Sequence, residues 1–155
     1  TLFRSMTNPL KATKSGLPFR HVPTYLAGYY KYKAGDQFTE GGKPVNGKRD
    51  ICDIYAIMYE TSESVPTLDG TNAFTSPNLI STARINNAKE TNEWTYFKLP
   101  FTTLPGKFID KEKLMDGKYN IAIVFTSSLE GDHFNGAIGS TLLIDEAELI
   151  YHSED

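Results

Sequence analysis

Short runs of β-branched and aromatic residues recur along the whole chain, separated by clusters of glycine, proline, asparagine and aspartate. Several runs alternate apolar and polar side chains, and their length and spacing are typical of a β-sandwich rather than a helical fold. We predict strands over residues 25–33, 51–60, 79–85, 94–101, 119–128 and 141–151, loops over 38–50 and 61–77, and one helical turn over 110–115. The sequence therefore predicts an all-β fold, a two-sheet antiparallel β-sandwich.

The size of the chain predicts a single domain. It has 155 residues, and no internal repeat divides it. Residues 16–155 are predicted to form the domain, with 1–15 as a tail or a linker from an upstream domain. Because the chain starts at Thr1 without an initiator methionine, we expect upstream sequence to have been removed.

The charge and composition argue against two classes of partner. The formal net charge is −3, and the 16 lysines and arginines are scattered, whereas a nucleic-acid-binding protein normally shows a basic stripe. No stretch approaches the roughly twenty apolar residues of a membrane helix, so we expect no direct membrane insertion. The single cysteine, Cys52, lies in an apolar run and is predicted to be a small buried hydrophobe.

The run over 94–101 separates its aromatic residues into two faces. Phe97 and Leu99 alternate with polar residues and are predicted to face the core. The same alternation places Trp94 and Tyr96 on the opposite face, where exposed rings could stack against the C–H faces of sugars. Core packing of Trp94 is the alternative, because one bulge would turn it inward. Pro100 predicts an edge strand or a bulge.

The run over 25–33 carries a second group of aromatic candidates. Tyr30 and Tyr32 share one face of the predicted strand, while Tyr29 lies on the other face with two lysines. Some of these rings are expected at the surface. We therefore treat Tyr29, Tyr30 and Tyr32, together with Trp94, as candidate ligand-binding residues.

The last predicted strand contains a carboxylate on its apolar face. A period of two puts Leu143, Asp145 and Leu149 on one face, predicted to be the inner one. A buried carboxylate is costly unless it is hydrogen-bonded, paired or bound to a metal. The structural interpretation is that Asp145 accepts hydrogen bonds that fix the strand. The alternative is a structural Ca²⁺ bound by Asp145 and Asp132, with loop carbonyls as further ligands.

The loop before this strand places glycines around several polar residues. Glycines allow tight turns and close backbone approach, so the loop is expected to have a defined shape. Asp132, His133 and Asn135 are candidates for hydrogen bonds to sugar hydroxyls, because binding groups usually lie on loops of a rigid scaffold. The alternative is a specific turn between two strands. One histidine and one aspartate do not make a zinc motif.

Hydrolysis of a glycosidic bond would need two carboxylates facing each other across a cleft, about 5–10 Å apart. The available carboxylates include Asp53, Asp132, Asp145 and Glu146. Sequence alone does not bring any two of them together, and no other catalytic motif is present.

Four stretches, in order, carry a resemblance to a known family. They are GLPFRHVPTYLAGYYKYKAGD, DICDIYAIMYE, EWTYFKLPF and SSLEGDHFNGAIGSTLLIDEAEL, and they extend over most of the chain. The chain resembles the putative carbohydrate metabolism domain family of bacterial proteins. The matching positions of the closing motif are Asp132, Phe134, Gly136, Gly139, Ser140 and Asp145. The resemblance implies a jelly-roll sandwich similar to carbohydrate-binding modules. It also implies a C-terminal position behind immunoglobulin-like domains, and an extracytoplasmic location in glycan-using bacteria.

Together these patterns predict a non-catalytic carbohydrate-binding domain that needs no catalytic cofactor. The expected ligand is a polysaccharide or oligosaccharide. One alternative is a structural or protein-interaction domain of a surface assembly, and another is a glycoside hydrolase acting through a carboxylate pair.

Overall fold

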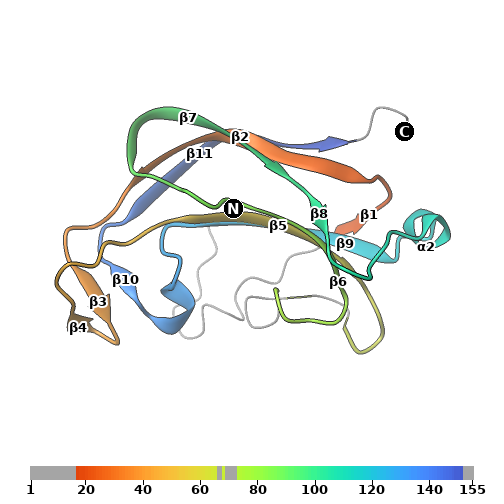
Figure 1. Cartoon of the computed structure of the whole chain (residues 1–155), viewed down its shortest axis with the longest axis horizontal. Coiled ribbons are helices and arrows are strands. Elements are labelled where there is room, and N and C mark those ends of the chain that lie inside the picture. Colours follow the sequence, from red (N-terminus) through yellow and green to blue (C-terminus); the bar gives the residue numbers. More distant parts are fainter. Residues whose placement is uncertain (1–16, 66–67, 69–72, 152–155) are drawn as a thin grey trace.

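The computed structural model describes residues 17–65, 68 and 73–151. Within them, two main β-sheets face each other, and a small sheet lies at one end (Figure 1). The predicted tail over residues 1–15 falls outside the described residues. In the part of the chain that is described, no helix is long and apolar enough to cross a membrane.

The large sheet has five antiparallel strands in the order β1-β9-β5-β6-β8. Its strands are β1 (Leu17–Phe19), β5 (Asp53–Glu60), β6 (Leu79–Arg84), β8 (Thr102–Thr103) and β9 (Tyr119–Thr126). The central strand β5 is buried on both faces as far as Tyr59. This explains why its sequence has no polar face, as in other strands that are covered on two sides.

The covering sheet has three antiparallel strands in the order β11-β2-β7. Its strands are β2 (Pro23–Lys33), β7 (Thr91–Pro100) and β11 (Thr141–Tyr151). β7 lies at an edge of this sheet, which is where a proline such as Pro100 is tolerated. Figure 1 shows the covering sheet arched over the large sheet.

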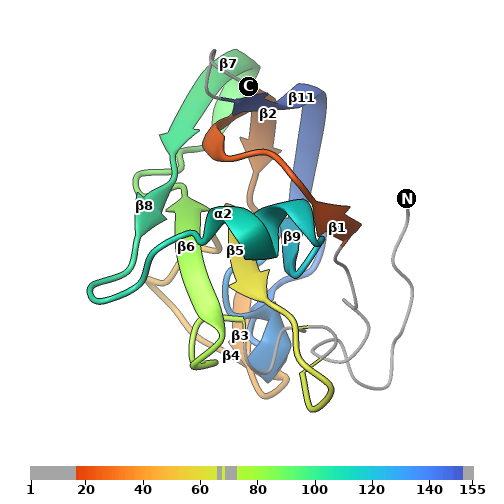
Figure 2. The same ribbon diagram turned by 90° about the vertical axis from the view of Figure 1, so that its right-hand side faces the viewer.

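The end sheet is small and was not predicted. It contains β10 (Gly136–Ala137), β3 (Phe38–Glu40) and β4 (Lys43–Pro44), so the predicted loop over 38–50 includes a short hairpin. The predicted helical turn is present as α2 (Lys111–Met115), at the opposite end of the sandwich (Figures 1 and 2). Asp110 caps it, because its carboxylate accepts hydrogen bonds from the backbone N–H groups of Glu112 and Lys113.

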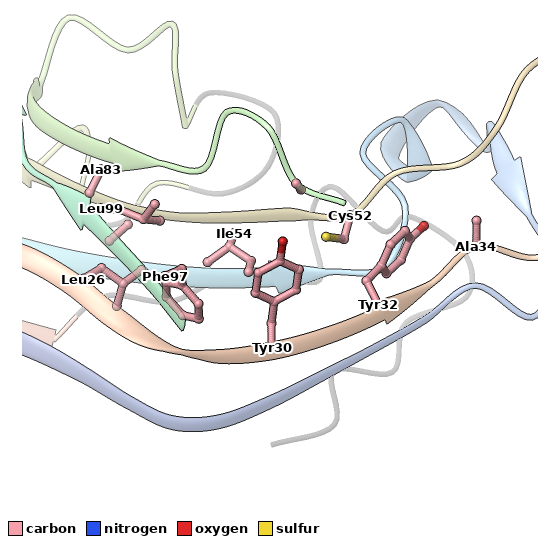
Figure 3. Packing of buried hydrophobic residues seen from close by; sticks show 11 residues of the cluster. Leu26, Tyr30, Tyr32, Ala34, Cys52, Ile54, Ala83, Phe97 and Leu99 are labelled. Carbon is pink, nitrogen blue, oxygen red and sulfur yellow. The ribbon is translucent and has the colours of Figure 1, made fainter. Parts of the chain in front are cut away.

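The main core lies between the large sheet and the covering sheet. Leu26, Tyr30 and Tyr32 of β2 point into this core (Figure 3). The same cluster contains Ile54 of β5 and Cys52, which directly precedes β5. The predicted burial of Cys52 is confirmed, and burial raises the pKa of its thiol to about 11. The opposite face of β5 carries a second cluster of buried residues, containing Tyr55, Ile57 and Tyr59.

Gly28 allows the covering sheet to pack closely. It pairs with Phe97 on β7, whose ring lies across the position that a side chain would occupy. A Cβ atom added at Gly28 would lie 2.8 Å from Cζ of Phe97 and 3.2 Å from Cα of Ala147. The absence of a side chain here lets Phe97 fill the core under β2.

The orientation predicted for the last strand is wrong in its first half. Leu142 and Ile144 pack against the core, whereas Asp145 is exposed on the outward face. The pairing of β11 with β2 shifts register between Asp145 and Glu148, and Glu146 has a φ of 50°. This β-bulge reverses the faces, so Leu149 packs inward as predicted while Asp145 does not.

The remaining predicted strands are present with small changes of boundary, and the all-β sandwich is confirmed. The jelly-roll type stays a prediction.

Candidate functional site

The outward face of the covering sheet is the strongest candidate site. The register places Tyr29 opposite Tyr96, and Tyr25 opposite Pro100. Because β7 buries Phe97 and Leu99, its even-numbered residues Trp94, Tyr96 and Lys98 must point outward. We call Tyr25, Tyr29, Lys31, Trp94, Tyr96 and Lys98 the aromatic face.

The side chains of the aromatic face contact one another in three groups. The rings of Tyr29 and Tyr96 lie 5.3 Å apart between centroids. At one side of this pair, Lys31 Nζ lies 4.8 Å from the centroid of the Trp94 ring. At the other side, Lys98 Nζ lies 4.3 Å from the centroid of the Tyr25 ring.

Large parts of these rings remain open to solvent. The exposed fractions are 36% for Tyr29, 44% for Trp94 and 53% for Tyr96. Trp94 and Tyr96 therefore lie at the surface, which excludes the core-packing alternative for Trp94, and Tyr29 is one of the exposed rings expected in its strand. Contiguous exposed apolar surface on a folded domain is typical of a binding surface.

Tyr30 and Tyr32 cannot contribute to this surface, which corrects their selection as ligand-binding candidates. They are only 5% and 2% exposed, because the pleat of β2 turns them into the core (Figure 3). The Tyr32 hydroxyl donates a hydrogen bond to the carbonyl of Ser127 at 2.8 Å. Burial raises the pKa of Tyr32 to about 12, so this hydroxyl stays protonated.

The loop that carries Asp132, His133 and Asn135 lies elsewhere. Asp132 and His133 belong to a short 3₁₀ helix, Gly131–His133, and their side chains lie 3.5 Å apart. Burial raises the pKa of Tyr55 to about 12, and the nearby charges of Asp53 and Asp132 contribute to that shift. Tyr55 lies on the face of β5 turned away from the covering sheet, and, among the described residues, none of the ring contacts of the aromatic face involves this loop.

Asn135 has a structural contact. Its Oδ1 accepts a hydrogen bond from the backbone N–H of Gly41, in the turn between β3 and β4. Lys48 adds a second connection, because its ammonium bridges Glu40 and Glu130 at 2.9 Å each. The loop is therefore attached to the end sheet.

A residue that the sequence analysis did not select, Asp50, organises this end of the molecule. Its Oδ2 accepts hydrogen bonds from the hydroxyls of Ser128 and Ser140 at 2.6 Å and from the N–H of Ala137 at 3.0 Å. Its Oδ1 accepts from the N–H of Ile51. Asp50 is buried, and Ser140, from the closing motif, is one of its partners. We call Asp50 and its partners the Asp50 junction.

A second buried carboxylate is Asp53, one of the carboxylates considered above for hydrolysis, and it is held by an arginine. Arg84 on the neighbouring strand contacts both oxygens of Asp53, with Nη2 at 2.7 Å and Nε at 3.2 Å. The guanidinium also lies 4.3 Å from the ring centroid of Phe74 and 5.7 Å from that of Tyr55. Asp53 is buried while Arg84 remains partly exposed, so the arginine supplies the charge that a buried carboxylate needs.

The structure does not unite the two predicted calcium ligands. Asp145 lies on the outward side of the covering sheet opposite Tyr29, whereas Asp132 lies in the 3₁₀ helix of the loop attached to the end sheet. Over residues 17–65, 68 and 73–151, no three histidine, cysteine, aspartate or glutamate residues are grouped as a metal site. Calcium binding stays a prediction.

Three residues of the aromatic face that were not predicted could have been found from the sequence. Tyr25, Lys31 and Lys98 share the parity of Tyr29 and Tyr96 in their strands, so pairing of β2 with β7 would have grouped them. No comparable signal marks the Asp50 junction, because Ser128, Ala137 and Ser140 lie 78 to 90 positions further along the chain.

Comparison with known proteins identifies relatives of the whole domain. A crystal structure of a putative glycoside hydrolase from Bacteroides thetaiotaomicron is 88% identical, with a TM-score of 0.93 over 96% of this chain and 43% of that one. A crystal structure of a putative glycoside hydrolase from Bacteroides vulgatus is 46% identical, with a TM-score of 0.87 over 95% of this chain and 59% of that one. The chain therefore spans less than two thirds of either relative.

No curated protein matches the chain. The profile of one family, the putative carbohydrate metabolism domain, matches residues 2–150, which is nearly the whole sequence. The chain therefore belongs to the putative carbohydrate metabolism domain family.

Proposed function

We propose that this chain is a non-catalytic carbohydrate-binding domain and that the aromatic face is its binding surface. The observation that carries the proposal is the exposure of Tyr29, Trp94 and Tyr96 on one side of a regular sheet. Aromatic rings offer sugars an apolar surface, and the family of the chain is one of carbohydrate metabolism.

The position of the rings on strands favours binding. Tyr29 and Tyr96 are fixed by direct cross-strand pairing, and the strands beneath them are held by the buried side chains of Leu26, Phe97 and Leu99. Rings that are already ordered lose little conformational freedom when a ligand binds. Because the surface is an open sheet face rather than a deep pocket, we expect modest affinity for a single sugar and higher affinity for a chain of sugars.

A glycoside hydrolase has less support. Among the described residues, the buried carboxylates Asp50 and Asp53 have structural partners, since Asp50 accepts hydrogen bonds at the Asp50 junction and Asp53 is paired with Arg84. Asp132 lies in the loop that is attached to the end sheet, whereas Asp145 lies on β11 opposite Tyr29. A pair of carboxylates that flank one bond would have to be close together.

The proposal also includes the cellular setting. We propose that the domain acts in an extracytoplasmic protein that holds a polysaccharide, and the support for this is the family resemblance alone. Detection of the parent protein at the cell surface by protease shaving would test the location, and its recovery only from the cytoplasmic fraction would contradict it.

A glycan array probed with the purified chain tests the binding function. We expect reproducible binding to at least one polysaccharide, with loss of that binding in Trp94→Ala and in Tyr96→Ala. Phe108→Ala is the matched control, because Phe108 is 71% exposed and lies outside the aromatic face. A double variant, Asp132→Ala with His133→Ala, tests the loop candidates in the same assay.

Three outcomes separate the hypotheses. Binding lost with Trp94 and Tyr96 but kept in Phe108→Ala supports the proposal. If binding is lost only in the variant of Asp132 and His133, or only when EDTA removes Ca²⁺, the ligand binds at the loop and not at the aromatic face. A blank array would contradict glycan binding and favour a protein-interaction domain.

A further inference from the structure

We propose that the aromatic face is selective for anionic glycans, in which the sugars carry carboxylate or sulfate groups. Lys31 and Lys98 would provide this selectivity. The inference rests on the proposed function, because it names the class of sugar that the same face would bind.

The two lysines flank the exposed ring pair. Lys31 lies beside Trp94 on one side of Tyr29 and Tyr96, and Lys98 lies beside Tyr25 on the other side. A sugar stacked on the Tyr29–Tyr96 pair would therefore have an ammonium group at either side. Successive outward residues of a strand are about 7 Å apart, so both ammonium groups are within reach of substituents on neighbouring sugars.

The charges of these lysines are not neutralised by a carboxylate. Among the described residues, neither Lys31 nor Lys98 forms an ion pair, and each ammonium group contacts an aromatic ring instead. By contrast, Lys48 and Lys113 have glutamate partners at 2.9 Å. A cation held over a ring keeps its full charge, so it can turn to an anionic ligand without breaking a salt bridge.

Carboxylates are present on the same side of the sheet, but on a different strand. Asp145 pairs with Tyr29 and Glu148 pairs with Ala27, so both belong to β11, whereas the lysines belong to β2 and β7. An anionic chain is therefore expected to follow β2 and β7 and to avoid β11. The two ammonium groups therefore lie beside the exposed rings, while Asp145 and Glu148 lie on the neighbouring strand β11.

Isothermal titration calorimetry with matched polysaccharides tests the selectivity. Polygalacturonate and its fully methyl-esterified form share a backbone and differ in charge, while chondroitin and chondroitin sulfate separate carboxylate from sulfate recognition. We expect the wild-type chain to bind at least one of the anionic polysaccharides. In at least one of the two pairs, the affinity should be about tenfold higher for the more highly charged polysaccharide, which is polygalacturonate in the first pair and chondroitin sulfate in the second. The affinity should fall as salt is raised.

A pair of double variants assigns the effect to the two lysines. Lys31→Met with Lys98→Met keeps the apolar stems but removes both charges, and it should abolish the preference for the charged form. Lys43→Met with Lys111→Met removes the same charge from β4 and α2, and it should keep the preference. Thermal unfolding of each variant checks that the fold is retained.

The outcomes distinguish this inference from the proposed function. Equal binding of the charged and uncharged forms, or a preference that persists without Lys31 and Lys98, would overturn the selectivity and leave glycan binding intact. Binding of only neutral glycans on the array would also overturn the selectivity and leave glycan binding intact. Failure to bind any glycan on the array or in the calorimeter would overturn both proposals. If the lysine double variant unfolds, the salt dependence and the charged-to-uncharged ratio of the wild-type chain still decide the question.

Discussion

The aromatic face and the Asp50 junction differ in how their side chains are held. On the aromatic face, Tyr29, Trp94 and Tyr96 are exposed and contact one another or a lysine. At the junction, Asp50 is buried and accepts hydrogen bonds from groups in two other segments. A polar residue whose hydrogen-bonding groups already have internal partners has few of them left to bind a ligand. An exposed ring on a rigid sheet still has a free surface for contact with a ligand. The difference supports a structural role for the junction, and it supports our proposal that the aromatic face binds the ligand.

The largest effect on this comparison is expected from Asp50→Ala. The substitution removes the acceptor of two hydroxyls and two backbone N–H groups, and the N–H groups of Ile51 and Ala137 have no rotatable alternative. We expect the free energy of unfolding to fall by about 3–5 kcal/mol, measured by urea denaturation. A loss below about 1 kcal/mol would show that the junction does not stabilise the fold.

A smaller effect is expected from Gly28→Ala, which tests the packing beneath the aromatic face. The new methyl group would meet the Phe97 ring at 2.8 Å, so the ring or the sheet must shift. We expect a loss of about 1–3 kcal/mol in unfolding free energy and weaker glycan binding. Gly131→Ala is the control, because its Cβ would find an ordinary contact of 3.4 Å with Ser128. Equal stability of the two variants would contradict the close packing.

The rings of the aromatic face should contribute little to stability. Trp94 and Tyr96 are about half exposed, Trp94 contacts Lys31, and Tyr96 contacts Tyr29. We expect Trp94→Ala and Tyr96→Ala each to cost no more than about 1.5 kcal/mol in thermal unfolding. A larger loss of unfolding free energy would show that these rings, like the residues of the Asp50 junction, stabilise the fold.

The smallest effect concerns Glu90, an exposed residue directly before β7. Hydrogen bonds from Arg49 and from the N–H of Ala34 lower the pKa of Glu90 from 4.5 to about 2. Because the folded-state pKa is depressed, this contact stabilises the fold above pH 4.5 and is lost as the pH falls through 2. An NMR titration should show the carboxyl of Glu90 titrating near pH 2.

The matched variants for Glu90 are Arg49→Gln and Lys48→Gln. The first removes the bidentate partner of Glu90 and should raise its pKa toward 4.5, while the second removes a neighbouring lysine that pairs with other glutamates. An unchanged Glu90 pKa in Arg49→Gln would refute the assigned cause.

The fold was predictable where local sequence decides the structure. The apolar run of β5 predicted a strand covered on both faces, and the alternation around Phe97 predicted which rings of β7 are exposed. The face of Asp145 was not predictable, because the bulge at Glu146 depends on pairing with β2. Residues such as Tyr30 and Tyr32 were overvalued, since a ring in a strand looks the same from sequence whether it faces the core or solvent.

Fluorescence of Trp94 tests the central claim most directly, because it is the single tryptophan of the chain and lies within the aromatic face. The experiment titrates a polysaccharide selected on the array into the purified chain and follows the emission of Trp94. We predict a saturable change in intensity and wavelength, with the same affinity as calorimetry gives, and loss of both signals in Tyr96→Ala. Glycan binding seen by calorimetry without any change in Trp94 emission would contradict the account and place the ligand elsewhere on the domain.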